Sequence, residues 1–261
     1  MSETAASATV TAFADECADL DALVRDLPAT DWSRATPAEG WTIAHQIAHL
    51  AWTDDVAILS ATDPDAFAAI VAEAARDPLG YVDRQAEVGA ARPPAELLTG
   101  WRSGRSRLAD ILSALDPDTR LDWFGPPMKP RSMATARLME TWAHGQDVAD
   151  ALGVTRAPTE RLHDICHLGV RTRDWAYVIT GKQVPTGEFR VELTSPSGEL
   201  WTWGPEAGDA AGGVVGSALE FCLVVTQRRD VAQTDLRSTG AATEWLTFAQ
   251  AFAGAPKGMR G

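Results

Sequence analysis

The sequence predicts an α-helical bundle over residues 1–180 and a small α+β domain over residues 181–261. Two observations predict this division. Apolar residues recur at helical spacing through the first part, and from Gly181 onward they alternate in the way typical of strands. A chain of 261 residues is long enough to form two such domains.

The first part divides into helices joined by polar or proline-rich connections. These helices are expected over residues 6–27, 42–61, 63–77, 93–116, 132–153 and 159–180. The first carries apolar residues on one face, at Val10, Phe13, Cys17, Leu20 and Val24. Thr42 can cap the second helix, Pro64 suits the first turn of the third, and Gly153 is a natural stop for the fifth.

The second part begins with a predicted β-hairpin. Phe189, Val191 and Leu193 alternate, the chain turns at "SPSG", and alternation resumes at Leu200. Two helices are expected after it, over residues 212–230 and 241–254, with room between them for a further short strand. Strands and helices together predict a small α+β domain.

Charge and composition limit the function classes. The formal net charge of −13 argues against a nucleic-acid surface, which needs clustered lysine and arginine. No stretch approaches the roughly 20 apolar residues of a membrane span, and the first residues lack the basic and apolar regions of a secretory signal. We therefore expect a cytoplasmic protein that acts on a small molecule, as a monomer or a homodimer.

Two histidines four residues apart, His45 and His49, lie in the apolar run "WTIAHQIAHLAW". Four residues place both imidazoles on nearly the same face of a helix, together with Trp52 and Val56. Each histidine is either a core residue satisfied by one hydrogen bond or a ligand for a bound group.

A second polar stripe occurs in "RLMETWAHGQDVAD". Glu140 and His144 are four residues apart, and Arg137 and Asp147 continue the same face of the helix. Ordinary exposed ion pairs have this spacing, but the neighbouring positions are small or apolar, which favours a stripe that lines a bundle interior. His163 and His167 form another pair at this spacing, without a comparable carboxylate partner, and a structural role is expected for them.

Together the two helices offer two imidazoles and a carboxylate, the ligand set of a catalytic zinc site with one position open. The same set suits Ni(II), Fe(II) or Mn(II). Three protein ligands with the remaining histidine close behind them are more consistent with catalysis than four, because a fourth protein ligand would close the site.

"GWTIAHQIAHLAW" and "ARLMETWAHGQDVADALG" resemble the actinobacterial DinB-like proteins that carry the metal-binding domain of mycothiol-dependent maleylpyruvate isomerase. The resemblance covers about residues 5–155 and implies a four-helix bundle that binds a divalent metal. Matched to the family's motifs, the ligands are His49, Glu140 and His144. His45, Arg137 and Asp147 are then supporting residues or, for His45, an occasional extra ligand.

The C-terminal part is similar to the small sterol-carrier-like domain fused to that bundle. In the family an arginine late in the corresponding helix reaches into the cleft between the domains, and Arg228 and Arg229 stand at the comparable place here. The resemblance implies a transferase or isomerase that adds a low-molecular-weight thiol, mycothiol, to a small electrophile. The alternatives are a hydrolase that uses metal-bound water and a non-catalytic metal-binding or scaffold protein.

Overall fold

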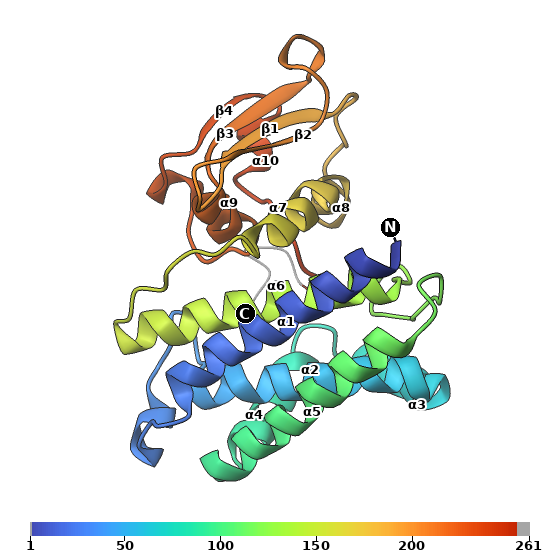
Figure 1. Cartoon of the computed structure of the whole chain (residues 1–261), viewed down its shortest axis with the longest axis vertical. Helices are drawn as coiled ribbons and strands as arrows, with labels where there is room; N and C mark the ends of the chain where they lie inside the picture. The colour runs from blue at the N-terminus through green and yellow to red at the C-terminus, as the bar shows by residue number, and fades with distance from the viewer. Residues whose placement is uncertain (1, 255–261) are drawn as a thin grey trace. The chain divides into compact units, whose positions relative to one another are not determined.

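The computed structural model of the chain describes residues 2–254 (Figure 1). It forms two compact units, Met1–Arg156 and Ala157–Gly261. The predicted boundary at residue 180 therefore lies inside the second unit. The difference has a packing cause: the predicted helix at 159–180 packs against elements of the second unit through buried Leu162, Ile165 and Cys166.

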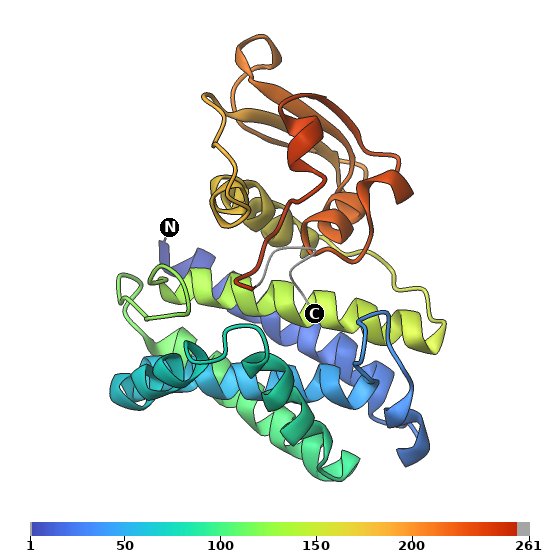
Figure 2. The ribbon, with the colours of Figure 1, turned by 180° about the vertical axis from the view of Figure 1, so that it is seen from behind.

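Four long helices pack against one another in the first unit (Figure 1). They are α1 (Ser2–Val24), α2 (Ile43–Thr62), α5 (Pro94–Ala114) and α6 (Pro130–Leu152). The shorter α3 (Pro64–Ala74) and α4 (Tyr81–Ala90) lie against α2, as Figure 2 shows from behind. The arrangement places α2 beside α6, the two helices whose polar stripes the sequence singled out.

Sequence periodicity predicted the core of this unit well. The apolar face expected for α1 is buried, at Val10, Phe13, Cys17, Leu20 and Val24. Fully burying a side chain of this kind stabilises the fold by roughly 1.5–3 kcal/mol. Gly153 ends α6 in the left-handed conformation (φ 69°), as its position predicted. The helix α4 was not predicted, because its polar sequence buries only Tyr81 and Ala86.

A partly buried ion cluster joins α1 to α5. Asp21 accepts hydrogen bonds of 2.7 Å from Nε and Nη2 of Arg102 and from Nη2 of Arg105. The hydrogen bond from Arg102, together with the charges of both arginines, outweighs the effect of burial and holds the pKa of Asp21 below its ordinary value. The cluster fixes the pairing of the two helices.

This lowered pKa predicts a pH-dependent stability. A carboxylate whose pKa is lower in the folded state stabilises the fold above its unfolded pKa, about 3.9 for aspartate, and that contribution is lost as the pH falls through the folded value. Asp21→Asn should therefore flatten the dependence of the free energy of unfolding on pH below about pH 5. Urea unfolding at a series of pH values measures this. The exposed Asp26→Asn is the control, and curves of equal slope for wild type and Asp21→Asn would contradict the assignment.

The second unit contains a four-stranded mixed sheet of order β2-β1-β3-β4. Its strands are β1 (Phe189–Thr194), β2 (Leu200–Trp203), β3 (Gly212–Ser217) and β4 (Arg237–Gly240). The predicted hairpin is confirmed, since β1 and β2 pair antiparallel with Val191 opposite Trp203. Strand β1 pairs in parallel with β3, where Val191 lies opposite Val214.

Within residues 157–254, the described part of this unit, there are four α-helices. They are α7 (Leu162–Arg171), α8 (Arg173–Ile179), α9 (Ala218–Val225) and α10 (Ala242–Trp245). The prediction of one helix over 159–180 was wrong, because the chain breaks at Thr172. The helix predicted from residue 212 was also wrong in its first half, which is β3. A Cβ at Gly212 would lie 2.7 Å from backbone atoms of the adjoining strand and helix, so this position suits a tightly packed strand of small residues.

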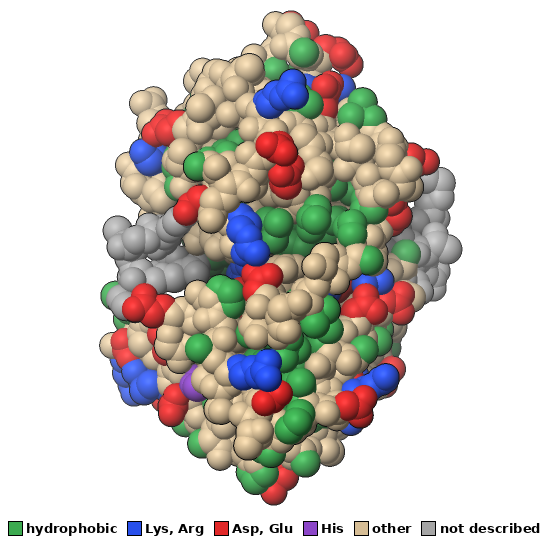
Figure 3. Space-filling view, turned by 90° about the vertical axis from the view of Figure 1, so that its left-hand side faces the viewer, with side chains coloured by type: hydrophobic (Ala, Val, Ile, Leu, Met, Phe, Trp, Pro, Cys, Tyr) green, Lys and Arg blue, Asp and Glu red, His purple; other side chains and the backbone are tan. Residues whose placement is uncertain are grey.

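Among the described residues, no helix combines the length and apolar character needed to cross a bilayer. Acidic and basic side chains are interspersed on the face drawn in Figure 3, and basic side chains do not gather into a patch there.

Candidate metal centre

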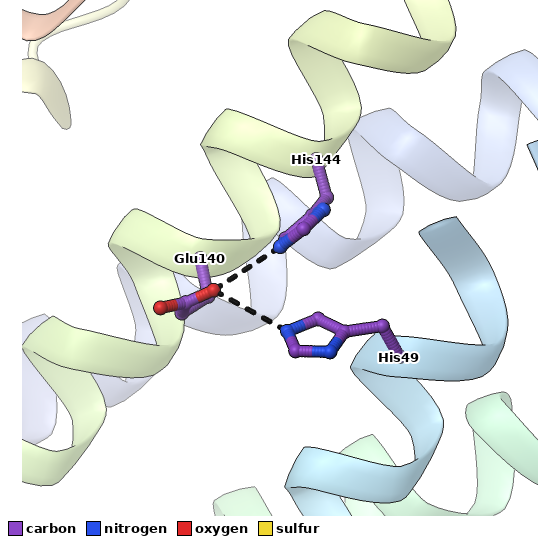
Figure 4. A group of neighbouring side chains, drawn as sticks. All are labelled: His49, Glu140 and His144. Atoms are coloured by element: carbon purple, nitrogen blue, oxygen red, sulfur yellow. Dashed lines mark hydrogen bonds and ion pairs between the residues drawn. The ribbon is translucent and has the colours of Figure 1, made fainter. Parts of the chain in front are cut away.

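Three polar side chains converge between α2 and α6 (Figure 4). The Nε2 atom of His49 lies 3.6 Å from Oε2 of Glu140, and Nε2 of His144 lies 3.2 Å from the same oxygen. One potential ligand atom from each residue lies within 4.8 Å of the others. Glu140 and His144 are four residues apart on α6, so one helical face presents both of them toward His49.

These side chains are sheltered but reachable. His49 and His144 are each 8% exposed, whereas the side chain of Glu140 is 21% exposed. Burial alone would raise the pKa of Glu140, but hydrogen bonds and charges from His144 and His49 outweigh it and hold this pKa well below its ordinary value. The centre therefore combines an ionised carboxylate with two imidazoles, and a small group can approach it from the side of Glu140.

A glutamine that sequence reasoning missed orients His144. Oε1 of Gln46, on α2, lies 2.5 Å from Nδ1 of His144, and Nε2 of Gln46 donates to Oγ1 of Thr36 at 2.8 Å. Because the amide oxygen can only accept, this contact places a proton on Nδ1 of His144, and Nε2 would then be the atom that binds a metal. Gln46 follows His45 directly in "AHQIAH", but its spacing alone did not reveal this contact.

This contact makes a prediction about metal affinity. Outer partners of ligating histidines typically contribute 10–100-fold to metal affinity, so Gln46→Leu should weaken zinc binding by about that factor. Competition with a chromophoric zinc chelator measures the change. The control is Gln146→Leu, on α6, where the amide donates to Asp150 instead. Equal zinc affinity for wild type and Gln46→Leu would show that Gln46 does not support the centre.

Two tryptophans border the centre. The ring of Trp41 is stacked on His144, with a centroid distance of 5.8 Å and an interplanar angle of 17°, and lies 5.3 Å from His49. The ring of Trp52, on α2, lies 6.2 Å from that of His49. Such rings lower the local dielectric, which strengthens electrostatic interactions within the centre.

His45 has other partners than the centre. Its Nδ1 accepts from the backbone N–H of Thr42 at 3.2 Å, which forms a capping box at the start of α2. Its Nε2 lies 2.7 Å from Oε2 of Glu87, on α4. The structure therefore explains this histidine by helix capping and by a contact between α2 and α4.

Arg137 and Asp147, the two other candidate supporting residues, both lie on α6. Oδ2 of Asp147 lies 4.0 Å from Nδ1 of His144. Arg137 is buried, and its Nε donates to Oδ1 of Asp54 at 2.9 Å. Sequence reasoning missed Asp54, which falls off the histidine stripe of α2. The pair connects α2 to α6 one turn away from the ligand group.

The remaining candidate residues lie in the second unit. Arg228 donates to the carbonyl of Thr226 and Arg229 to that of Arg228, each at 2.7 Å, just after α9. His163 packs edge-on against Trp201, with ring centroids 4.9 Å apart, and Nδ1 of His167 accepts from Nε1 of Trp203 at 3.3 Å. Over the described part of the chain, neither histidine belongs to a group that can hold a metal.

The donors of the centre fit a divalent metal ion. Two imidazole nitrogens and one carboxylate oxygen are the three protein ligands of many catalytic zinc sites, which keep a fourth position open. A buried nitrogen, Nδ1 of His49, has no hydrogen-bond partner among the described residues, whereas Nδ1 of His144 is held by Gln46. With a metal present, the two Nε2 atoms and Oε2 of Glu140 would be the ligand atoms.

Residues 13–149 match the family described as the mycothiol maleylpyruvate isomerase N-terminal domain. Uncharacterized proteins from two strains of Mycobacterium tuberculosis are each 57% identical to this chain over 242 residues, which is 92% of this chain and 93% of the relative. The likeness therefore extends over both units of the structure.

Solved structures show the same fold. The crystal structure of the mycothiol-dependent maleylpyruvate isomerase matches with a TM-score of 0.58 and 15% identity, over 89% of this chain and 92% of that one. A histidine-to-alanine mutant of that isomerase matches with a TM-score of 0.56 and 15% identity, over 86% and 90% of the two chains.

Proposed function

The chain belongs to the mycothiol maleylpyruvate isomerase N-terminal domain family, and from this premise we propose that it binds a divalent metal and uses a low-molecular-weight thiol, with mycothiol as the first candidate, to isomerise or modify a small electrophile. The observation that carries the proposal is the convergence of His49, Glu140 and His144 between α2 and α6. Zinc fits this set, and nickel, iron and manganese are the other candidates.

In this proposal each residue has a stated task. His49, Glu140 and His144 hold the metal, which when bound lowers the pKa of a coordinated thiol and so supplies a nucleophile near neutral pH. Gln46 keeps the Nε2 lone pair of His144 directed at the centre. Trp41 shields the two imidazoles from water. The four long helices would form a DinB-like four-helix bundle.

The second unit, in this proposal, is a sterol-carrier-like domain that contributes to substrate binding. Arginine binds carboxylates through paired hydrogen bonds, so Arg228 or Arg229 would hold an acidic group of the substrate. Substituting each arginine in turn by methionine distinguishes them. Loss of the arginine that binds the substrate should raise KM, while the metal content stays at the wild-type value.

Thiol binding to the cobalt-loaded protein tests the proposal directly. Cobalt(II) in place of zinc reports thiolate coordination by an intense near-ultraviolet absorption band, which should appear as mycothiol is added and be absent in His49→Ala. Because His49→Ala removes one of the proposed metal ligands, it should also reduce the metal content per chain.

Two other outcomes decide between the alternatives. Turnover of ester or amide substrates without any thiol, with a pH profile set by bound water, would support a metal-dependent hydrolase. Tight metal binding with no thiol band and no turnover would support a non-catalytic metal-binding or scaffold protein. Either result would overturn the thiol-dependent assignment.

A further inference from the structure

Five aromatic side chains form a continuous cluster that begins at the candidate metal centre. We call it the aromatic cluster, and it consists of Trp52, Phe67, Tyr81, Trp123 and Phe124. Trp52 is the member next to His49, with ring centroids 6.2 Å apart. Its ring also lies 5.8 Å from Tyr81 and 6.4 Å from Phe124.

The outer end of the cluster is carried by the connection between α5 and α6. Leu121 and Met128 exchange two backbone hydrogen bonds of 2.8 Å, which close this connection into a short loop. Oγ of Ser60, on α2, donates to the carbonyl of Asp122 at 2.6 Å and holds the loop against the helix. The loop places Trp123 in a stack on Phe67, with ring centroids 6.1 Å apart and an angle of 12°.

Exposure increases across the cluster from its base. Phe67 and Tyr81 are 3% and 4% exposed and form a buried base, whereas Trp52 and Trp123 are half-buried and Phe124 is 36% exposed. The hydroxyl of Tyr81 donates to Glu73, so this residue contributes its ring rather than a free polar group. Trp52, the ring next to the centre, and Phe124 are therefore partly exposed above a buried base.

We propose that the aromatic cluster is a binding subsite for a planar apolar group, such as a phenyl ring, on the ligand whose polar end reaches the metal centre. This inference rests on the proposed function, because it locates the subsite relative to the metal. Trp52 provides the continuity, since its ring contacts both His49 and Phe124. Aromatic rings bind planar apolar groups by offset stacking and edge-to-face contact.

The subsite narrows the substrate class. A ligand that carries only carboxylates would leave Trp52 and Phe124 in water, whereas an aryl or similar apolar substituent would cover them. Tyr81 and Phe67, which are buried and held by neighbouring helices, give the subsite a rigid base. We therefore infer that the preferred substrate is an electrophile with an aromatic or bulky apolar substituent.

Two thiols that differ only by a phenyl group test the subsite. Ethanethiol and 2-phenylethanethiol are titrated into the cobalt-loaded protein, with the cobalt–thiolate absorption band and tryptophan fluorescence as readouts. We expect 2-phenylethanethiol to bind at least about tenfold more tightly, the effect of covering one ring by aromatic contacts and apolar burial. Phe124→Ala should reduce this preference toward unity while ethanethiol binds as before.

The controls separate the two levels of the proposal. Trp175→Ala removes a ring of matched exposure (38%) on α8 and should keep the preference. Phe124 lies on the loop and is 36% exposed, so Phe124→Ala is expected to keep both the fold and the metal. Equal affinities of the wild-type protein for the two thiols, with the band present for both, would overturn the subsite and leave the proposed function standing. If neither thiol produces the band, both the subsite and the proposed function are overturned.

Discussion

Glu140→Gln is expected to lower the affinity for zinc by more than about 100-fold while the helices stay folded. The variant keeps the size of the side chain but replaces the charged carboxylate, one of the three proposed ligands, with a neutral amide. Residues behind the ligands typically contribute 10–100-fold, so the loss of a ligand should exceed that range. Oε2 of this carboxylate lies within 3.6 Å of both imidazole Nε2 atoms, which makes it the shared neighbour of the group.

Chelator competition and metal content per chain measure this effect, and circular dichroism verifies the fold. Glu87→Gln is the matched control, since Glu87 contacts His45 on the neighbouring helix instead of the centre. His45→Ala should likewise retain the metal and lower only the stability, because its ring caps α2. Retention of zinc in Glu140→Gln, or its loss in His45→Ala, would require a different ligand set.

Arg137→Met is expected to lower the free energy of unfolding by about 3–5 kcal/mol. This is the typical effect of removing one partner of a buried ion pair while the other stays buried. Arg137 and Asp54 are 1% and 0% exposed. Nη2 of Arg137 and Oδ2 of Asp54 have no hydrogen-bond partner among the described residues. Burial raises the pKa of Asp54, and the guanidinium opposes that rise. Removing Arg137 alone leaves the carboxyl group buried without its counter-charge.

A double variant distinguishes this cause from a simple packing defect. In Arg137→Met with Asp54→Leu, both polar groups are gone, and the stability should return toward that of wild type, since apolar replacements of buried pairs are often neutral or stabilising. Arg131→Met, exposed on the same helix, should change the stability by no more than about 0.5 kcal/mol. Denaturant unfolding measures all of these, and equal losses in the single and double variants would contradict the assignment.

The family match and the candidate metal centre fall in the same part of the chain. The family match at residues 13–149 includes all three residues of the candidate metal centre. The aromatic cluster lies in the same range, with Trp52 adjoining the centre and Phe124 at its outer end. The proposed aromatic subsite can therefore be tested by substitutions in the first unit alone.

Local spacing in the sequence was enough to predict the long helices and the shared helical face of Glu140 and His144. Apolar residues at helical spacing set the buried face of α1, and the four-residue spacing of Glu140 and His144 put both on one face of α6. The change of pattern after Gly181 predicted the hairpin of β1 and β2. These features depend on residues near one another in the chain, so their periodicity carries the information.

Contacts between distant segments were decided only by the tertiary structure. Gln46 reaches His144 across 98 positions and Asp54 reaches Arg137 across 83, and no spacing rule connects such residues. The same holds for His45. Its spacing from His49 suggested that both could bind one metal, but its ring contacts Thr42 and Glu87 instead. Helix periodicity specifies which face a side chain occupies, whereas the packing of one helix on another decides which partner it meets.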